Sequence, residues 1–322
     1  MRRSAQLLCP LLLLVILTTL TGCQSASLRF LSLIGIKKDP LVVALVAERQ
    51  TEKQESALAI FDPFAPYQKM QTALGDSLAR PVGLDLCFPI QLPAALRSGM
   101  SHLAIISPGQ YARLDQRESY PVVAFAVDRN GQTTRPAVLI VPAKSDITCV
   151  EDLRGRTVTF GPAGNGRAHL AALRLLAAHG LAKKDLSLEL LPVPGSLKHM
   201  PNARSLAQTV MNLSSDAGFL DIAAWNDLPP HSDAQDEPAQ DRLRVVAETT
   251  GVPIGLVVAS PKLPEATVTQ VREALLDLSV HHADAMQPLG ITGYVAPTPE
   301  LLDACAKLVE KTNTAPADNT NP

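Results

Sequence analysis

The chain reads TVTFGPAGNGRAHLAALRLLAAHG from residue 157 to residue 180, and this stretch decides its fold class. Residues 157–160 are mostly β-branched and aromatic, which predicts a strand. Residues 168–178 are rich in Ala and Leu, which predicts a helix, and Gly180 is a favoured helix stop. A glycine-rich turn joins the two elements. A strand that leads through a short turn into a helix is the repeating unit of α/β proteins.

The same alternation continues on both sides of this stretch. Short apolar runs predict strands that are buried on both faces of a sheet. The predicted strands are residues 41–47, 82–86, 103–106, 122–127, 137–141, 186–191, 217–220, 244–247 and 255–259. The predicted helices are residues 66–78, 92–96, 203–213, 265–278 and 301–309, with a further short helix through Tyr111. We therefore expect an α/β protein in which helices cover mainly parallel sheets.

Composition bounds the number of domains and the class of partner. The chain of 322 residues is 46% hydrophobic and 19% charged, so it can bury a core. A domain holds about 150 residues, which predicts two domains. The formal net charge of −2 gives no electrostatic reason to expect nucleic acid as a partner. The polar stretch 229–241 is predicted to be a loop, and residues 312–322 a disordered tail.

The N-terminus carries an export signal. Arg2 and Arg3 precede an apolar run, and the sequence Leu-Thr-Gly-Cys ends at Cys23. Charge, apolar core and small residues before a cut site predict a signal peptide over residues 1–22, although a plain anchor helix with a chance cysteine is the alternative. Leu-x-Gly-Cys resembles the lipobox of bacterial lipoproteins. That resemblance implies a lipid on the Cys23 thiol, a tether over residues 23–40, and an extracytoplasmic location in the cell envelope.

Few residues suggest catalysis, a metal or a cofactor. None of the seven His residues forms an HExxH motif, and no Cys/His group has zinc spacing. There is no GxSxG elbow and no Walker lysine. Past Cys23, three cysteines remain, Cys87, Cys149 and Cys305, so at most one disulfide can form within the chain. We expect neither an enzyme nor a metal or cofactor site.

The glycine-rich turn admits two interpretations. Gly164-x-Gly166 begins like a dinucleotide fingerprint, but His169 stands where the third glycine belongs. A turn that exposes backbone N–H groups at a helix N-terminus is suited to binding an anion. The alternative is that the glycines serve turn geometry alone. The local sequence leaves both interpretations open.

Other candidate residues lie near the predicted strand ends. Tyr67 and Tyr111 could present a hydroxyl to a ligand, although a single Tyr in such a place is more often a half-buried packing residue. His199 could donate to an anion or be an ordinary surface residue. Asp216 and Asp221 flank the predicted strand at 217–220, where they could also be turn or cap residues.

The order of five segments resembles a known family. The segments are Phe64-Ala-Pro-Tyr67, residues 96–111, residues 147–160, His199 followed by Asp216-Ala217, and residues 253–259. In this order they resemble the phosphate/phosphonate-binding receptors of ABC importers, a family of type II periplasmic binding proteins. The resemblance extends over roughly residues 41–309.

The resemblance implies two doubly wound α/β domains joined by a hinge of two crossings. The first domain would comprise residues 41–140 and 244–311, and the second residues 141–243, with crossings near Val141 and Leu243. The ligand would lie between the domains. The residues that would hold it are Tyr67, Ser107, Tyr111, Gly164, Asn165, Gly166, Arg167, His199, Asp216 and Asp221.

One part of the family pattern is absent. Where the family places consecutive Ser/Thr residues, this chain has Gly164, Asn165 and Gly166. We therefore expect the ligand to be held there by backbone N–H groups and the Asn165 amide, with Arg167 adding charge.

The resemblance implies a function in transport. The protein would be a monomeric, membrane-tethered receptor that captures a small oxyanion, such as phosphate, phosphite or a phosphonate, and passes it to an ABC permease. A receptor of the same fold for another small molecule, such as a sulfonate or a thiamine precursor, is one alternative. A sensory lipoprotein that signals through a partner is another.

Overall fold

The computed structural model describes residues 39–46, 62–189, 194–228 and 239–308. The predicted signal peptide, Cys23, nearly all of the tether and the predicted tail lie outside these residues. In the part of the chain that is described, no helix has the length and apolar character needed to cross a membrane.

The first lobe is built on a six-stranded sheet with the order β13-β4-β12-β3-β1-β2. Its strands are β1 (Leu41–Val46), β2 (Val82–Cys87), β3 (Leu103–Ile106), β4 (Val122–Asp128), β12 (Leu256–Ala259) and β13 (Ile291–Val295). β1 is parallel to β2 and β3, whereas β12 is antiparallel to β3 and β4. β13 is antiparallel to β4. Two strands that follow late in the sequence thus complete a sheet begun by four early ones.

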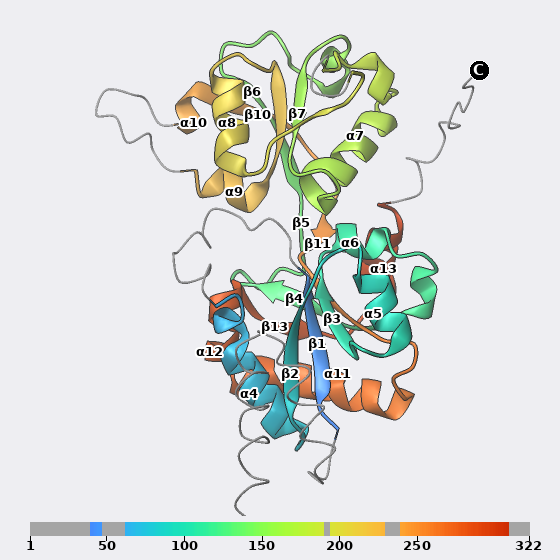
Figure 1. Ribbon diagram of the computed structural model, residues 1–322. Coiled ribbons are helices and arrows are strands. Elements are labelled where there is room, and N and C mark those ends of the chain that lie inside the picture. The colour runs from blue at the N-terminus through green and yellow to red at the C-terminus, as the bar shows by residue number, and fades with distance from the viewer. Residues whose placement is uncertain (1–38, 47–61, 190–193, 229–238, 309–322) are drawn as a thin grey trace, which may run out of the picture.

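Helices cover both faces of this sheet (Figure 1). On one face lie η2 (Ala65–Tyr67), α4 (Gln68–Ser77), α11 (Glu265–His281), α12 (Ala283–Met286) and η7 (Gln287–Leu289), and on the other α5 (Leu92–Ser98), α6 (Pro108–Ala112) and α13 (Pro299–Ala306). A short turn of helix, η3 (Arg117–Ser119), precedes β4. Alternation along β1 supplies both cores, since Leu41, Val43 and Leu45 pack on the α4 side and Ala44 on the α5 side.

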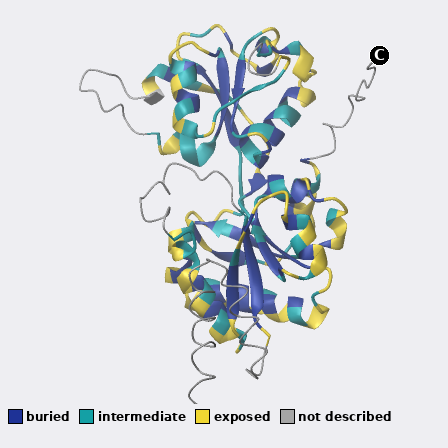
Figure 2. Ribbon diagram, viewed as in Figure 1, coloured by how far each residue is buried: buried dark blue, intermediate teal, exposed yellow. Residues whose placement is uncertain are grey.

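The second lobe is built on a five-stranded sheet with the order β10-β6-β9-β7-β8. Its strands are β6 (Ala137–Pro142), β7 (Val158–Phe160), β8 (Lys198–His199), β9 (Ala217–Asp221) and β10 (Leu243–Glu248). β7 is parallel to β8 and β9, and β6 is antiparallel to β9 and β10. Figure 2 shows the sheets of both lobes as buried layers between helices whose outer sides are exposed.

Two layers of helices enclose the second sheet. On one side lie η4 (Val150–Leu153), η5 (Gly166–Ala171), α7 (Ala172–Ala178) and η6 (Lys183–Asp185), and on the other α8 (Ala203–Met211), α9 (Ile222–Asn226) and α10 (Ala239–Arg242). Successive side chains of β6 point to opposite faces of the sheet. Leu139 and Val141 pack in the core on one face, and Val138 and Ile140 pack in the core on the other. The predicted α/β class, with two lobes and two crossings, is confirmed. The expectation of mainly parallel sheets is wrong, because each sheet combines parallel pairs with antiparallel ones.

The crossings do not lie where they were predicted. β5 (Thr134–Arg135) pairs antiparallel with β11 (Val252–Pro253), and these two short strands link the lobes (Figure 1). The predicted crossings near Val141 and Leu243 are wrong, because both positions lie inside the second sheet, where Leu243 pairs with Pro142. An apolar strand looks the same on either side of a domain boundary, so only its pairing partner reveals the sheet to which it belongs.

One predicted strand is reduced to single bridges. Residues 186–191 were expected to form a strand, and the described part of this stretch makes only the isolated bridges Thr157↔Ser187 and Glu189↔Ser196. The edge of the sheet is instead β8, which the sequence did not predict.

We expect the second lobe to depend on one aromatic stack. Phe219 is fully buried and stacks on Phe160 with ring centroids 5.6 Å apart. Phe219→Ala should lower the free energy of unfolding by about 3–5 kcal/mol, because it opens a cavity that the core cannot fill. Phe88→Ala is the matched control, since Phe88 is 57% exposed and its loss should change stability by about 0.5 kcal/mol or less. Urea unfolding measures both, and equal midpoints for the two variants would contradict this assignment.

Candidate functional site

The lobes meet at the turns that follow β3 and β7. In α/β sheets, ligands bind beyond the carboxyl ends of the strands, which is where α6 and η5 begin. An ideal Cβ placed on Gly109 in α6 would lie 2.1 Å from the carbonyl oxygen of Gly164 and 3.0 Å from the amide nitrogen of Gly166. The backbone of the first lobe therefore touches the backbone of the glycine-rich turn. Beside this contact, Ala112, Leu170 and Val252 form a buried apolar cluster that joins both lobes to the second crossing.

A cationic side chain reaches across the same contact. Arg113 is the C-cap of α6, and an ideal Cβ on Gly164 would lie 1.8 Å from its Nη2. Gly164 also has a φ of +85°, a left-handed conformation that favours glycine. The backbone conformation therefore favours glycine at this position, and the Arg113 guanidinium would have to move to admit a side chain.

The glycine-rich turn satisfies most of its own donors. Asn165 is the N-cap of η5, and its Oδ1 accepts hydrogen bonds from Arg167 N at 3.0 Å and Ala168 N at 2.9 Å. The Gly164 N–H donates to His169 Nδ1 at 2.8 Å, and the Asn165 N–H donates to Pro162 O at 2.9 Å. The expectation that Gly164, Asn165 and Arg167 offer their N–H groups to a ligand stays a prediction, and a ligand that used these groups would have to displace the internal hydrogen bonds. An N-cap Asn satisfies the first amides of its helix intramolecularly, which is why such residues are favoured there.

Arg167 is likewise engaged within the protein. Its Nε donates to Asp221 Oδ2, and its Nη1 donates to the carbonyl oxygens of Pro253 at 3.3 Å and Ile254 at 3.5 Å. Asp221 also accepts a hydrogen bond from Ala223 N at 2.8 Å as the N-cap of α9. The charge of Arg167 is thus compensated by a carboxylate and anchored to the second crossing.

This ion pair belongs to a longer chain of charges through the hinge. Arg135, on the first crossing, lies 3.9 Å from Asp221 of the second lobe and 3.8 Å from Asp128 of the first lobe. All four side chains are largely buried, with the most accessible, Arg135, 25% exposed. Because buried charges are costly unless they are paired, these ion pairs link the orientation of the two lobes to that of the crossings.

Two histidines pack beneath the turn. Their rings lie 4.6 Å apart and nearly perpendicular, with Phe160 within 6.0 Å of both. His199 Nδ1 lies 2.7 Å from Gly161 O and must carry the proton, because a carbonyl can only accept. His169 Nδ1 accepts from Gly164 and must be unprotonated. Burial, with His199 and Arg113 as neighbours, lowers the pKa of His169 from 6.5 to about 4.

The site residues that were predicted in the first lobe mainly pack in its core or cap its helices. Tyr111 is buried in the core that contains Cys305, and burial raises the pKa of its hydroxyl. Ser107 is the N-cap of α6, where its Oγ accepts from Gln110 N at 3.3 Å and its N–H donates to Gln110 Oε1 at 2.9 Å. Tyr67 ends η2 and packs, partly buried, against the core of the first lobe.

Asp216 lies at the wrong end of the second sheet for a ligand contact. It immediately precedes β9, whereas Asp221 is the last residue of that strand. At about 3.3 Å per residue, the two are separated by roughly 16 Å. Asp216 Oδ2 accepts a hydrogen bond from Thr157 N at 2.7 Å, so it organises the amino edge of the sheet. This position does not favour the predicted contact of Asp216 with the ligand, and we do not assign Asp216 to the site.

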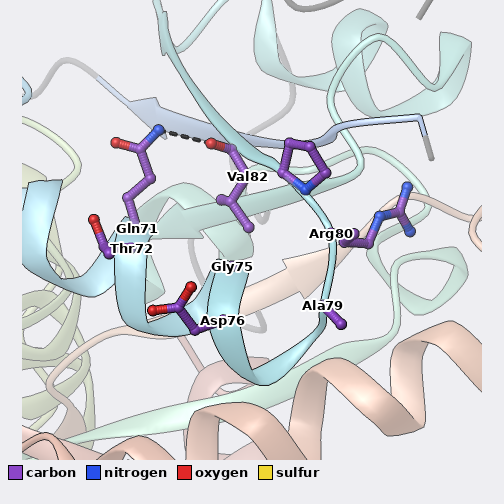
Figure 3. A pocket seen from close by; sticks show the side chains of 8 residues that line it. Gln71, Thr72, Gly75, Asp76, Ala79, Arg80 and Val82 are labelled. Carbon is purple, nitrogen blue, oxygen red and sulfur yellow. Dashed lines mark hydrogen bonds between the residues drawn. The ribbon is translucent and has the colours of Figure 1, made fainter. Parts of the chain in front are cut away.

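A separate hollow lies at the far end of the first lobe (Figure 3). It is lined by Gln71, Thr72, Gly75, Asp76, Ala79, Arg80, Pro81 and Val82, between the end of α4 and the start of β2. Gln71 Nε2 donates to Val82 O across it at 2.7 Å. This is the amino edge of the parallel strands, opposite to the edge at which α/β proteins bind ligands. Among the described residues, no three metal-binding side chains are grouped together.

Several residues of the lobe contact had no signal in the sequence. Arg113, Arg135 and Asp128 are ordinary charged residues until the fold brings them to the hinge. His169 was noticed only because it replaces a glycine of the dinucleotide pattern. Its hydrogen bond to Gly164, five residues earlier, is a local contact that the spacing allows but does not require.

Comparison with known proteins gives consistent matches. A family model described as the periplasmic substrate-binding protein of phosphonate ABC transporters matches residues 64–302. No curated protein sequence matches the chain. XAC2383 from Xanthomonas citri, solved with a chloride ion, superposes with a TM-score of 0.65 at 18% identity, covering 84% of this chain and 95% of that one.

Two further solved structures share the fold. PhnD1 from Prochlorococcus marinus, in complex with methylphosphonate, has a TM-score of 0.61 at 14% identity, covering 86% of this chain and 100% of that one. A binding protein component of an ABC phosphonate transporter from Pseudomonas aeruginosa, PA3383, has a TM-score of 0.55 at 14% identity, covering 82% and 83%. At these identities the superpositions establish the fold alone.

The buried His169 predicts a loss of stability in acid. Its pKa is lowered in the folded state, so between pH 6.5 and about 4 the unfolded chain binds a proton that the folded chain does not. The stability that the neutral His169 provides is fully present above pH 6.5 and is lost as the pH falls towards 4. The free energy of unfolding should fall by at most about 3 kcal/mol over this range. His169→Gln, which does not titrate, should flatten the pH dependence of the free energy of unfolding over this window. Identical pH profiles for the variant and the wild type would contradict the prediction.

Proposed function

Because this chain belongs to the family of periplasmic substrate-binding proteins of phosphonate ABC transporters, we propose that it is a lipid-anchored receptor for a small oxyanion. The family is a transport family that works outside the cytoplasm with an ABC permease, and it is not an enzyme family. The proposal adds the anchor, the class of ligand and the residues that bind it. The observation that carries it is the extent of the family match, since residues 64–302 include the second sheet, both crossings and every strand of the first sheet except β1.

The chemistry of the lobe contact supports an anionic ligand. The Arg113 guanidinium lies against the glycine-rich turn, and the first turn of the continuous helix η5–α7 begins there. A guanidinium and a helix N-terminus both favour negative charge. Of the solved structures that share the fold, one holds methylphosphonate and another a chloride ion. We therefore propose a phosphonate, phosphate or phosphite as the ligand.

The proposed contacts are fewer than the sequence suggested. His199 uses Nδ1 for Gly161, which leaves Nε2 as the nitrogen that can meet a ligand. Gly166 supplies a backbone N–H at the start of η5, and Tyr67 and Ser107 supply hydroxyls from the first lobe. Asp221 is paired with Arg167 and is therefore not assigned to an amine of the ligand. Tyr111 supports α6 from within the core.

The anchor is proposed from the N-terminal sequence alone. Cys23 follows the predicted signal peptide and ends a Leu-Thr-Gly-Cys stretch that resembles a lipobox. Two acyl chains would hold the protein durably on a bilayer, because each buried methylene adds about 0.8 kcal/mol. We propose that the receptor acts as a monomer tethered by residues 23–40 to the cell envelope.

The anchor is tested by fatty-acid labelling. Wild-type protein expressed with a radiolabelled or alkyne-bearing fatty acid should carry the label and sediment with membranes. Cys23→Ala should carry none and should accumulate unprocessed or in the soluble fraction, because the acyl-accepting thiol is gone. Cys149→Ala, which removes an exposed cysteine of the folded body, is the control and should be labelled like the wild type. Label on the Cys23→Ala protein would overturn the anchor.

The ligand is tested by a panel on the purified protein. Thermal shift and calorimetry with phosphate, phosphite, alkylphosphonates, sulfate and sulfonates should identify a stabilising oxyanion, worth about 2.7 kcal/mol when the free ligand is a hundredfold above Kd. His199→Ala should weaken the binding of that ligand about 10- to 100-fold, as expected for a hydrogen bond to a charged group. His179→Ala, at an exposed site bonded to Glu151, should not.

Two results would redirect the proposal. If only a sulfonate or a thiamine precursor stabilises the protein, the fold and the transport role remain and the ligand class is wrong. If an oxyanion binds but deletion of the protein abolishes a transcriptional response and leaves uptake intact, the protein is a sensory lipoprotein and delivery to a permease is wrong.

A further inference from the structure

Gly109 is a glycine for a reason other than its backbone conformation. It lies inside α6, and its φ is not in the left-handed region, unlike that of Gly164. Gly109 is the second residue of this five-residue helix, and Ala is the better helix former, by about 1 kcal/mol in a helix interior. The local sequence therefore favours a side chain at this position, and only the neighbouring lobe opposes one.

The opposing atoms are backbone atoms that cannot rotate away. An ideal Cβ on Gly109 would lie 2.1 Å from Gly164 O and 3.0 Å from Gly166 N, and ordinary contacts begin at about 3.4 Å. The turn that carries these atoms is held by the Asn165 cap and by the Arg167–Asp221 ion pair. A methyl group at Gly109 therefore requires the two lobes to move apart by more than an ångström at this point.

The contact lies close to the hinge, where small displacements are magnified. An ideal Cβ on Gly166 would lie 3.3 Å from Gly109 N and 3.4 Å from Val252 Cγ1, and Val252 is part of the second crossing. A separation of about an ångström next to the crossings becomes several ångströms at the distant ends of the lobes. Hinged receptors hold their ligands by closing the two lobes around them.

We propose that the contact of Gly109 with Gly164 and Gly166 is the stop that sets how far the lobes close, and that Gly109 thereby limits the size of the ligand. This inference rests on the proposed function for its consequence, the choice of ligand, but its structural part does not need a ligand. A side chain at position 109 would hold the lobes further apart and weaken the binding of the smallest ligands most.

The closure is measured as a distance between the lobes. Nitroxide labels are placed on the full chain at Cys149, which is exposed on the second lobe, and at Ser77→Cys, which is exposed on the first. Cys87 and Cys305 are buried, and protein without Ser77→Cys is labelled in parallel to show that the distance arises from this pair. Pulsed electron paramagnetic resonance then gives the distance distribution.

The expected result is graded. Gly109→Ala should lengthen the mean distance, Gly109→Val should lengthen it further, and Gly166→Ala, with its milder 3.3 Å contact, should change it least of the three. Gly75→Ala is the matched control, because Gly75 also lies in a helix of the first lobe and its ideal Cβ meets no atom closer than 3.4 Å. It should leave the distance unchanged. Circular dichroism confirms that each variant is folded, and Gly166→Ala remains as a test if Gly109→Val does not fold.

The outcomes separate this proposal from the proposed function. An unchanged distance in folded Gly109→Ala and Gly109→Val overturns the stop, whatever ligand the protein binds. A lengthened distance supports the stop even if no oxyanion binds. If an alkylphosphonate series binds, Gly109→Ala should lower affinity for methylphosphonate at least tenfold more than for the longest alkyl member, and an equal loss along the series would overturn the role in ligand size.

Discussion

The carboxylate of Asp221 is the point on which the arrangement of the lobes depends. It ends β9, caps α9, pairs with Arg167 of the glycine-rich turn and lies beside Arg135 on the first crossing. Arg167 in turn donates to two carbonyl oxygens next to the second crossing. One partly buried anion thus joins the second sheet, the turn and the first crossing. Because an unpaired buried charge costs several kcal/mol, these partners cannot separate independently.

The turn held by this ion pair shows how a family site can be remodelled. The glycine-rich turn, which stands where the family places Ser/Thr residues, predicted a cradle of N–H groups, yet Asn165 accepts two of them and His169 a third. A short side chain with a carbonyl oxygen performs intramolecularly what an anion would perform from outside. Transport by a two-lobed receptor belongs to the family as a whole, whereas the identity of the ligand depends on the few donors that the turn leaves unused.

The contact of Gly109 with Gly164 and Gly166 is made of backbone atoms, which makes it sensitive to any added side chain. Side chains at an interface can change rotamer to accommodate a substitution, but Gly164 O and Gly166 N are fixed by the turn that contains them. The apolar cluster of Ala112, Leu170 and Val252 next to them leaves little room for adjustment. The geometry of closure is therefore encoded by the absence of a side chain at Gly109.

The sequence by itself determined the α/β class, most of the strands, and the strand–turn–helix at residues 157–180, because buried strands and helices leave a local periodicity in the chain. It also identified the family, whose segments occur in order. Only the tertiary structure decided the crossings at β5 and β11, the separation of Asp216 from Asp221 along β9, and the burial of Tyr111. Each of these depends on which distant residue becomes a neighbour. The clearest case is Gly109, where helix propensity favours Ala and the reason for glycine is the carbonyl of Gly164, 55 residues later and in the other lobe.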